Sequence, residues 1–237
     1  MFRKPFTSLS VIWLVVGGAL ACDRPLCAEP GARKKPATRR DQIDREVKPV
    51  IDKVDQQCRE RTVYMIGPAK AKRLAVLVRE KKPRLVVECG TAIGYSGLWI
   101  GRELRALGQG KLITIEIDEA RAAEAKQNFD EAGLSEWIEV RVGDARELVK
   151  NVEGPVDFLF IDCNFENYDP CFTGIETKLA KDAVVVADNV GIGAASMADY
   201  LKRVRSKYRS QTEWFDLDLP WEKRDAIEIT RLGTAKE

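Results

Sequence analysis

The sequence predicts an α/β fold in which a doubly wound, mostly parallel sheet carries an antiparallel hairpin at its edge. Two observations support this prediction. From about residue 60 to residue 190, short apolar segments alternate with longer amphipathic ones, as expected for parallel strands joined by crossover helices. Near the C-terminus, two strand-like segments are separated only by a turn, and this predicts the hairpin.

The predicted elements begin with a helix over residues 40–59, for which Thr38 or Asp41 is a candidate N-cap. A second helix over 69–80 ends ahead of Pro83, since proline cannot continue a helix. Strands are then predicted at 84–90, 112–117, 138–142, 156–161 and 183–187. The helices between them are predicted at 96–107, 119–132, 145–151 and 168–179. The hairpin strands are predicted at 212–217 and 226–232.

The composition excludes several kinds of site. The 237 residues include 39 basic and 37 acidic ones, so the overall charge gives no support for a nucleic-acid partner. Histidine is absent, which excludes the usual catalytic triads and imidazole metal sites. The six cysteines form no C-x-x-C pair, which argues against a zinc ribbon. Any metal is therefore expected to bind oxygen or sulfur.

Residues 1–28 resemble a signal peptide or a membrane anchor. Arg3 and Lys4 precede an apolar run, and Ala19-Leu-Ala21 is an A-x-A cleavage pattern. Cys22 could instead be the lipidated cysteine of a bacterial lipoprotein. Basic residues between 33 and 40 favour retention on the cytoplasmic side, so the sidedness stays open. We expect a linker over 29–40 and a domain over 41–232, with its core at 60–232.

A glycine-rich turn, residues 88–96, follows the predicted strand 84–90. In doubly wound sheets, ligands bind beyond the carboxyl ends of the strands. Gly90 permits the tight turn, Gly94 is expected to let the backbone approach the ligand, and the next helix points amide groups at it. The G-x-x-x-G spacing differs from the G-x-G-x-x-G dinucleotide fingerprint. It therefore favours S-adenosylmethionine (SAM) over NAD.

Acidic residues end the strands that follow. Glu116 is placed to accept both hydroxyls of a ribose. Asp144, Asp162 and Asp188 end later strands, and Asn189 follows the last of them. The oxygens of Asp162, Asp188 and Asn189 form a set suited to a hard cation such as Mg²⁺. The alternative is that Asp188-Asn189 only caps a turn.

Together these motifs resemble the cation-dependent O-methyltransferases, the family of catechol and caffeoyl-CoA O-methyltransferases and their bacterial relatives, over nearly all of residues 60–232. The segments 64–70 and 225–229 add to the resemblance. It implies a Rossmann-like SAM-dependent methyltransferase fold, with SAM and a divalent cation, expected to be Mg²⁺, as cofactors. The implied cofactor-binding residues are Ile66, Glu88, Gly90, Thr91, Gly94, Ser96, Glu116, Asp144, Ala145 and Asp162. The implied metal ligands are Asp162, Asp188 and Asn189.

The resemblance implies methyl transfer from SAM to a hydroxyl of a small catechol-like or polyhydroxylated aromatic acceptor, assisted by the metal. Family members commonly carry a catalytic lysine three residues after the first aspartate, and Phe165 stands there in this chain. Lys70 and Glu166 are substitute candidates for the base, and the sequence requires neither. A non-catalytic SAM-binding module and an NAD-dependent oxidoreductase therefore stay open as alternatives.

The expected partner is the aromatic small molecule, and no nucleic acid is expected. Membrane attachment through the N-terminus and a homodimer are open predictions. Because SAM is made in the cytosol, a need for SAM favours a cytoplasm-facing domain, whereas the signal-like segment favours export or membrane association.

Overall fold

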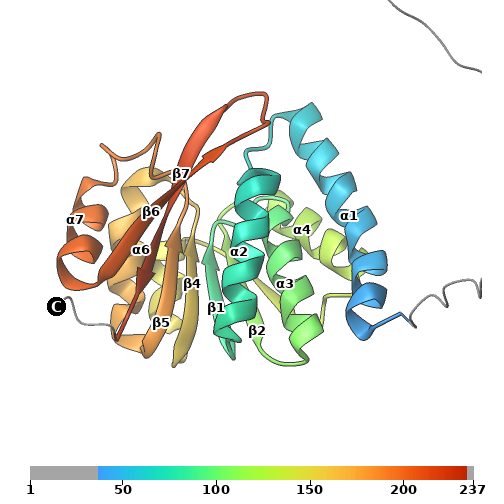
Figure 1. Cartoon of the computed structure of the whole chain (residues 1–237), viewed down its shortest axis with the longest axis horizontal. Coiled ribbons are helices and arrows are strands. Elements are labelled where there is room, and N and C mark those ends of the chain that lie inside the picture. The colour runs from blue at the N-terminus through green and yellow to red at the C-terminus, as the bar shows by residue number, and fades with distance from the viewer. Residues whose placement is uncertain (1–36, 234–237) are drawn as a thin grey trace, which may run out of the picture. The chain divides into compact units, whose positions relative to one another are not determined.

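Seven strands form one sheet in the order β3-β2-β1-β4-β5-β7-β6 in the computed structural model, which describes residues 37–233 (Figure 1). The parallel strands are β1 (Leu85–Cys89), β2 (Lys111–Glu116), β3 (Ile138–Val142), β4 (Val156–Ile161) and β5 (Leu179–Ala187). The antiparallel strands are β6 (Arg209–Asp216) and β7 (Arg224–Arg231), and β7 pairs with both β5 and β6. The predicted doubly wound sheet with its edge hairpin is confirmed.

Helices cover both faces of the sheet (Figure 1). The helices packed on one face are α1 (Arg39–Arg61), α2 (Gly67–Lys81), α3 (Tyr95–Leu107) and α4 (Glu119–Glu131). Those on the other face are α5 (Ala145–Leu148), α6 (Tyr168–Ile175) and α7 (Ala198–Lys207). The sheet is therefore buried on both sides, and each face has its own apolar cluster.

Strand β4 shows why the parallel strands are continuous apolar runs in the sequence. Phe158 and Phe160 pack toward α1–α3, whereas Leu159 and Ile161 pack toward α6 and α7. All four side chains are fully buried. Burying a side chain of this size stabilises the fold by roughly 1.5–3 kcal/mol. A polar residue on either face would lose this contribution, so polar residues in the central strands are confined to their ends and to hydrogen-bonded positions.

Helix α1 begins with a capping box. The Thr38 hydroxyl accepts from the backbone amide of Asp41 at 3.1 Å, and the Asp41 carboxylate accepts from the amide of Thr38 at 2.8 Å. The prediction of Thr38 as an N-cap is confirmed. The predicted linker is too long at its C-terminal end, because residues 39–40 are helical. The predicted signal-like segment at 1–28 and the linker residues 29–36 lie outside the described residues.

Two helix predictions need correction. The predicted helix 168–179 is shorter: α6 ends at Ile175, a 3₁₀ turn spans 176–178, and Leu179 already begins β5. Helix α7 was not predicted, although Tyr200, Leu201 and Val204 form its buried face at helical spacing. Its N-cap lacks a side-chain hydrogen bond, so the sequence carries no start signal there. Between residues 37 and 233, no helix has both the length and the apolar character needed to cross a membrane.

The buried carboxylate of Glu103 joins helices α1, α2 and α3. It accepts hydrogen bonds from Arg40, Arg79 and Arg102, and its side chain is 0% exposed. Burial alone raises the pKa of Glu103, but the hydrogen bonds from the three arginines outweigh it and lower this pKa below its ordinary value of 4.5. The ion cluster therefore stabilises the packing of α1 as long as Glu103 is ionised.

We expect Glu103→Gln to lower the free energy of unfolding by roughly 1–3 kcal/mol at neutral pH, because three charged hydrogen bonds are weakened. The folded-state pKa is depressed, so the contribution is present above pH 4.5 and is lost as the pH falls below it. Urea unfolding of both proteins as a function of pH measures this. Glu139→Gln is the control. The side chain of Glu139 is 43% exposed, so its ion pair with Arg141 contributes little to stability. A pH-independent gap between wild type and Glu103→Gln would contradict the prediction.

Candidate active site

A cavity of about 830 Å³ opens at the carboxyl ends of β1, β2, β4 and β5. Segment 64–70 ahead of β1, the 217–223 connection between β6 and β7, and the start of β7 also line it. Ligands of doubly wound sheets bind at this edge, and the volume lies in the range of small-molecule sites. The lining includes every predicted site residue except Glu88 and Gly94.

Glycines shape the turn between β1 and α3. Gly90 has a φ of +103°, and a Cβ there would lie 1.8 Å from the carbonyl oxygen of Asp162, so only glycine lets the ends of β1 and β4 approach. Gly94 has a φ of +97°, and its Cβ would lie 2.8 Å from the ring of Phe129 in α4. Gly94 was expected to let the backbone approach the ligand. The structure shows that it permits close packing of α3 on α4, and the ligand contact stays a prediction.

Glu116 holds the turn from the end of β2. Its Oε2 accepts from the amides of Thr91 at 3.2 Å and Ala92 at 2.8 Å, and its Oε1 accepts from the amide of Asp118 at 3.0 Å. A carboxylate offers about four acceptor positions, so about one is left for a ligand. The predicted bidentate ribose contact would therefore require one of these backbone bonds to be exchanged. Glu116 nevertheless lines the cavity, as predicted.

Glu88 lies beneath the turn and does not reach the cavity. Its Oε2 accepts from the Thr114 hydroxyl at 2.5 Å, whose oxygen also contacts the Thr91 hydroxyl, and Oε1 has no partner among the described residues. Burial raises the pKa of Glu88 to about 7, against the lowering effect of hydrogen bonds from Ser96 and Thr114. Glu88 thus supports the turn from below, and its predicted cofactor contact stays a prediction.

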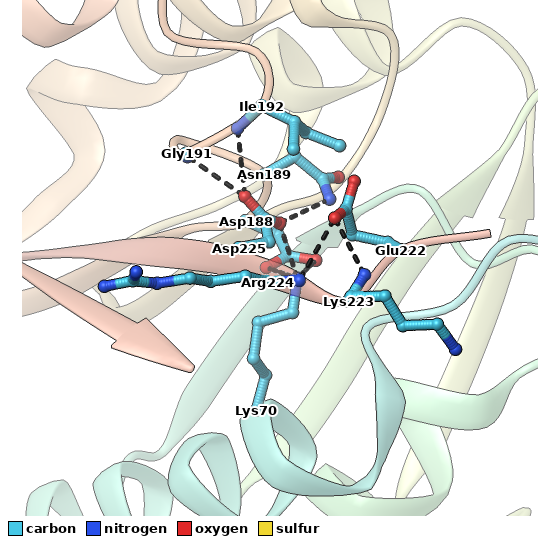
Figure 2. Close-up of polar contacts among 9 residues, drawn as sticks. All are labelled: Lys70, Asp188, Asn189, Gly191, Ile192, Glu222, Lys223, Arg224 and Asp225. Atoms are coloured by element: carbon cyan, nitrogen blue, oxygen red, sulfur yellow. Dashed lines mark hydrogen bonds and ion pairs between the residues drawn. The ribbon is translucent and has the colours of Figure 1, made fainter. Parts of the chain in front are cut away.

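Three buried charges meet at the opposite end of the cavity (Figure 2). The Lys70 ammonium donates to Oδ1 and Oδ2 of Asp188 at 2.6 and 2.8 Å, and to Oδ2 of Asp225 at 2.9 Å. Burial alone lowers the pKa of Lys70, but the charges of both aspartates outweigh it and raise this pKa above its ordinary value. Lys70 is therefore held protonated, whereas a general base needs a free amine.

Asp162 lies beside this cluster, directly after β4. No described residue donates a hydrogen bond to its carboxylate, which lines the cavity. Burial and the charge of Asp188 raise the pKa of Asp162 well above its ordinary value, although Lys70 opposes them. The carboxylates of Asp162 and Asp188 therefore repel each other when both are ionised. The single positive charge of Lys70 does not cancel this repulsion.

Asn189 completes the predicted metal set. It has a φ of +55°, in the left-handed region that asparagine tolerates. Its Nδ2 donates to Oδ2 of Asp225 at 2.9 Å. The cavity wall brings Asn189 together with Asp162 and Asp188, as expected from parallel strands that end at one edge. Counting only His, Cys, Asp and Glu, residues 37–233 contain no group of three that could hold a metal.

The remaining predicted residues lie along the cavity wall. Ile66 is buried at the start of α2. Asp144 accepts from the amide of Arg146 at 2.9 Å, which caps α5, and its carboxylate also pairs with the Arg146 side chain. Phe165 is half-buried in a 3₁₀ turn, and Glu166 is exposed beside it. Phe165 thus lines the cavity at the position where family members commonly carry a lysine.

Two features of the wall were not predicted from the sequence: the contact between Tyr64 and Trp221, and the position of Arg121. Tyr64 and Trp221 form an edge-to-face pair with ring centroids 5.5 Å apart, which closes the cavity between segment 64–70 and the hairpin connection. Arg121 in the first turn of α4 also lines it. Its position was accessible from the sequence, since a helix that follows an acid-terminated strand starts at the same edge of the sheet. The Tyr64–Trp221 pair joins segments too distant for a local pattern to reveal.

Comparisons with known proteins agree with this geometry. Residues 87–190 match the family model of a methyltransferase domain. The catechol O-methyltransferase of Sus scrofa is 30% identical to this chain over 164 residues, which cover 66% of this chain and 86% of that protein. The chain belongs to the catechol O-methyltransferase family. The resemblance inferred from the motifs is thereby confirmed.

Other members of the catechol O-methyltransferase family match a smaller part of their own length. The catechol O-methyltransferase of the bacterium Niastella koreensis is 35% identical over 129 residues, which cover 53% of this chain and 58% of that protein. The Mus musculus enzyme is 32% identical over 165 residues, 66% of this chain and 60% of that protein. The chain thus spans about three fifths of the length of these relatives.

Solved structures confirm the Rossmann-like methyltransferase fold. The O-methyltransferase TomG from Streptomyces achromogenes, in complex with SAM, has a TM-score of 0.67 and 22% identity. The alignment covers 84% of this chain and 100% of TomG. The O-methyltransferase from Bacillus cereus, in complex with SAH, has a TM-score of 0.63 at 22% identity, over 84% of this chain and 92% of that one.

The raised pKa of Glu88 predicts how stability depends on pH. Its folded-state pKa of about 7 lies above the ordinary value of 4.5. The folded state therefore binds the proton more tightly, and stability falls as the pH rises through this window. Glutamine cannot ionise, so Glu88→Gln should gain stability relative to wild type by roughly 2–4 kcal/mol between about pH 4.5 and about pH 8.

Urea unfolding at both pH values measures this relative gain. Glu147→Gln is a matched control, because the side chain of Glu147 is 68% exposed. For the control, the difference from wild type should stay constant across the window. The same constant difference for Glu88→Gln would show that folding does not raise the pKa of Glu88.

Proposed function

We propose that the chain transfers a methyl group from SAM to a hydroxyl of a small catechol-like or polyhydroxylated aromatic acceptor, with Mg²⁺ at Asp162, Asp188 and Asn189. One observation carries this proposal: the same cavity contains the glycine-rich turn with Glu116 at one end and the acidic set at the other. Family membership supports methyl transfer, and the acidic set supports a cation-assisted acceptor hydroxyl.

The cavity fits an elongated cofactor that lies across the strand ends. β2, which ends in Glu116, and β5, which precedes Asp188, are three strand spacings apart in the sheet order, or roughly 14 Å at about 4.8 Å per strand. SAM supplies the methyl group as a positively charged sulfonium. The turn at 90–96 and the start of α3 provide backbone amides at one end, and the carboxylates provide negative charge toward the other.

The acidic end also fits a hard divalent cation. In their ionised forms, three carboxylates face one ammonium there, an excess of two negative charges. Asp162 receives no hydrogen bond from the described residues. The amide nitrogen of Asn189 donates to Asp225, so the amide oxygen of Asn189 is not used in this contact. Carboxylate and amide oxygens suit Mg²⁺, which would lower the pKa of an acceptor hydroxyl and orient it. Lys70 orients Asp188 by holding both of its oxygens.

Phe165 determines how acidic the acceptor hydroxyl has to be. The half-buried ring offers an apolar wall for an aromatic acceptor and excludes water from the cavity. With Lys70 held protonated, the exposed carboxylate of Glu166 remains of the two substitute candidates for the base. We therefore propose that the chain methylates acidic hydroxyls, which need little help to lose a proton. Phe165 equally favours the alternative of a non-catalytic SAM-binding module, and family membership removes the oxidoreductase alternative.

Calorimetric titration with SAM and methylation of a catechol panel test this proposal on wild type and Asp188→Asn. We expect both proteins to bind SAM within about 3-fold of each other. Wild type should methylate a catechol and lose at least about 100-fold in rate on chelation, since one metal ion orients and acidifies the hydroxyl. Asp188→Asn should show little activity with or without Mg²⁺. An equal response of both proteins to Mg²⁺ would sink the metal assignment, and SAM binding without any methylation would support the non-catalytic module.

Replacing Phe165 with lysine should raise kcat for weakly acidic phenols by about 10-fold or more at neutral pH, because it adds a general base beside the acceptor. Phe165→Met is the matched control, since it removes the ring without adding a base. Rates measured at saturating SAM report the effect. If both variants lose activity equally, the ring itself matters for acceptor binding and proton removal is not limiting.

A further inference from the structure

Asp225, near the start of β7, receives four hydrogen bonds (Figure 2). Its Oδ1 accepts from the backbone amides of Gly191 at 3.0 Å and Ile192 at 3.1 Å. Its Oδ2 accepts from Nδ2 of Asn189 and from Nζ of Lys70, both at 2.9 Å. The residue is 0% exposed. A carboxylate has about four acceptor positions, so Asp225 is saturated by protein donors and has none left for a ligand.

This saturation decides which way the Asn189 amide points. The amide carries one donor group and one acceptor oxygen. Because Oδ2 of Asp225 can only accept, it selects the nitrogen, and the oxygen of Asn189 is directed elsewhere. The turn that follows wraps tightly around the same carboxylate, since a Cβ on Gly191 would lie 2.7 Å from Oδ1 of Asp225. The backbone of Asn189 is therefore fixed as well, with its φ of +55°.

The same carboxylate also places Lys70. Lys70 bridges Oδ2 of Asp225 to both oxygens of Asp188, with all three side chains at most 1% exposed. Two of the three oxygen ligands assigned in the proposed function thus depend on Asp225. It holds Asn189 directly, and it holds Asp188 through Lys70.

We propose that Asp225 is a positioning residue that keeps the oxygen of Asn189 directed at the cavity and Lys70 against Asp188, and so prepares the site for a divalent cation. This inference rests on the proposed function. Hydrogen-bond partners of metal ligands commonly change metal affinity 10–100-fold when they are replaced. Asp225 acts without contacting the cation, because its own acceptor positions are filled.

An amide at position 225 would reverse the arrangement. In Asp225→Asn, the amides of Gly191 and Ile192 keep their acceptor oxygen, which puts the new NH₂ group where Oδ2 stands. That group would face two other donors, Lys70 and Asn189. Asn189 can relieve the conflict only by turning its amide, which directs an NH₂ group at the cation. The loss is therefore one of a ligand oxygen.

The experiment uses Mn²⁺ as the probe, with binding followed by electron paramagnetic resonance on the full chain, and SAM affinity measured by calorimetry. We expect Asp225→Asn to weaken Mn²⁺ binding by at least about 10-fold and to change SAM affinity by less than about 3-fold. The double variant Asn189→Asp/Asp225→Asn should recover most of the Mn²⁺ affinity. In it, the new NH₂ group donates to one oxygen of residue 189, and the other oxygen faces the cavity.

Recovery is the decisive readout, because a residue with only a structural role would not be rescued by changing its partner. Asn189→Asp alone completes the double-mutant cycle. Glu213→Gln is the matched control: this carboxylate on neighbouring β6 pairs with Arg73 at 2.7 Å and does not line the cavity. Its Mn²⁺ affinity should equal that of wild type. Should Asp225→Asn fail to fold, Gly191→Ala pushes the turn away from Asp225 and should also weaken Mn²⁺ binding.

Three results would overturn the inference, and they separate it from the proposed function. If wild type binds Mn²⁺ and Asp225→Asn binds it equally well, only the positioning role fails. If Asp225→Asn weakens binding but the double variant does not recover it, Asp225 serves the fold and not the ligand orientation. If wild type binds SAM but no Mn²⁺, the metal assignment of the proposed function is wrong, and so is this inference.

Discussion

The charge balance around Lys70 is the constraint on which the acidic end of the cavity depends. A carboxylate that is buried without a partner costs several kcal/mol, so Asp188 and Asp225 need the ammonium between them. Lys70 lies in α2, Asp188 directly after β5, and Asp225 in β7. Asp188 and Asp225 lie 118 and 155 residues after Lys70 in the chain. The Lys70 ammonium therefore fixes α2, the loop after β5 and the hairpin relative to one another.

The two ends of the cavity treat their acids differently. At the turn, the carboxylate of Glu116 is largely used by backbone amides, and Glu88 lies buried beneath with a raised pKa. These acids hold the backbone in shape. At the other end, Asp162 has no hydrogen-bond donor among the described residues and an elevated pKa. Carboxylate oxygens without a donor are thus available to a ligand at this end, while the turn end offers mainly shape and amide groups.

The sequence predicted the parts of the site that depend on strand ends. Asp162, Asp188 and Asn189 meet because parallel strands end at one edge of the sheet. The alternation of apolar and amphipathic segments in the sequence is enough to predict this arrangement. The roles of Gly94 and Asp225 were not predictable, because they depend on Phe129 of α4 and on Lys70 of α2. Spacing within a motif carries no information about such neighbours. Helix α7 was not predicted for a local reason, because the side chain at its N-cap makes no capping hydrogen bond.

Phe165 connects the missing base to the proposed cation. A lysine at this position, common in the family, would in its protonated form reduce the excess negative charge of the ionised cluster from two to one. With Phe165 the excess stays at two, which is the charge that a divalent cation neutralises. The loss of the base therefore also strengthens the attraction that the ionised cluster would exert on a divalent cation. On this reasoning the chain would attract a divalent cation more strongly and, under the proposed function, would leave proton removal to the acidity of the acceptor.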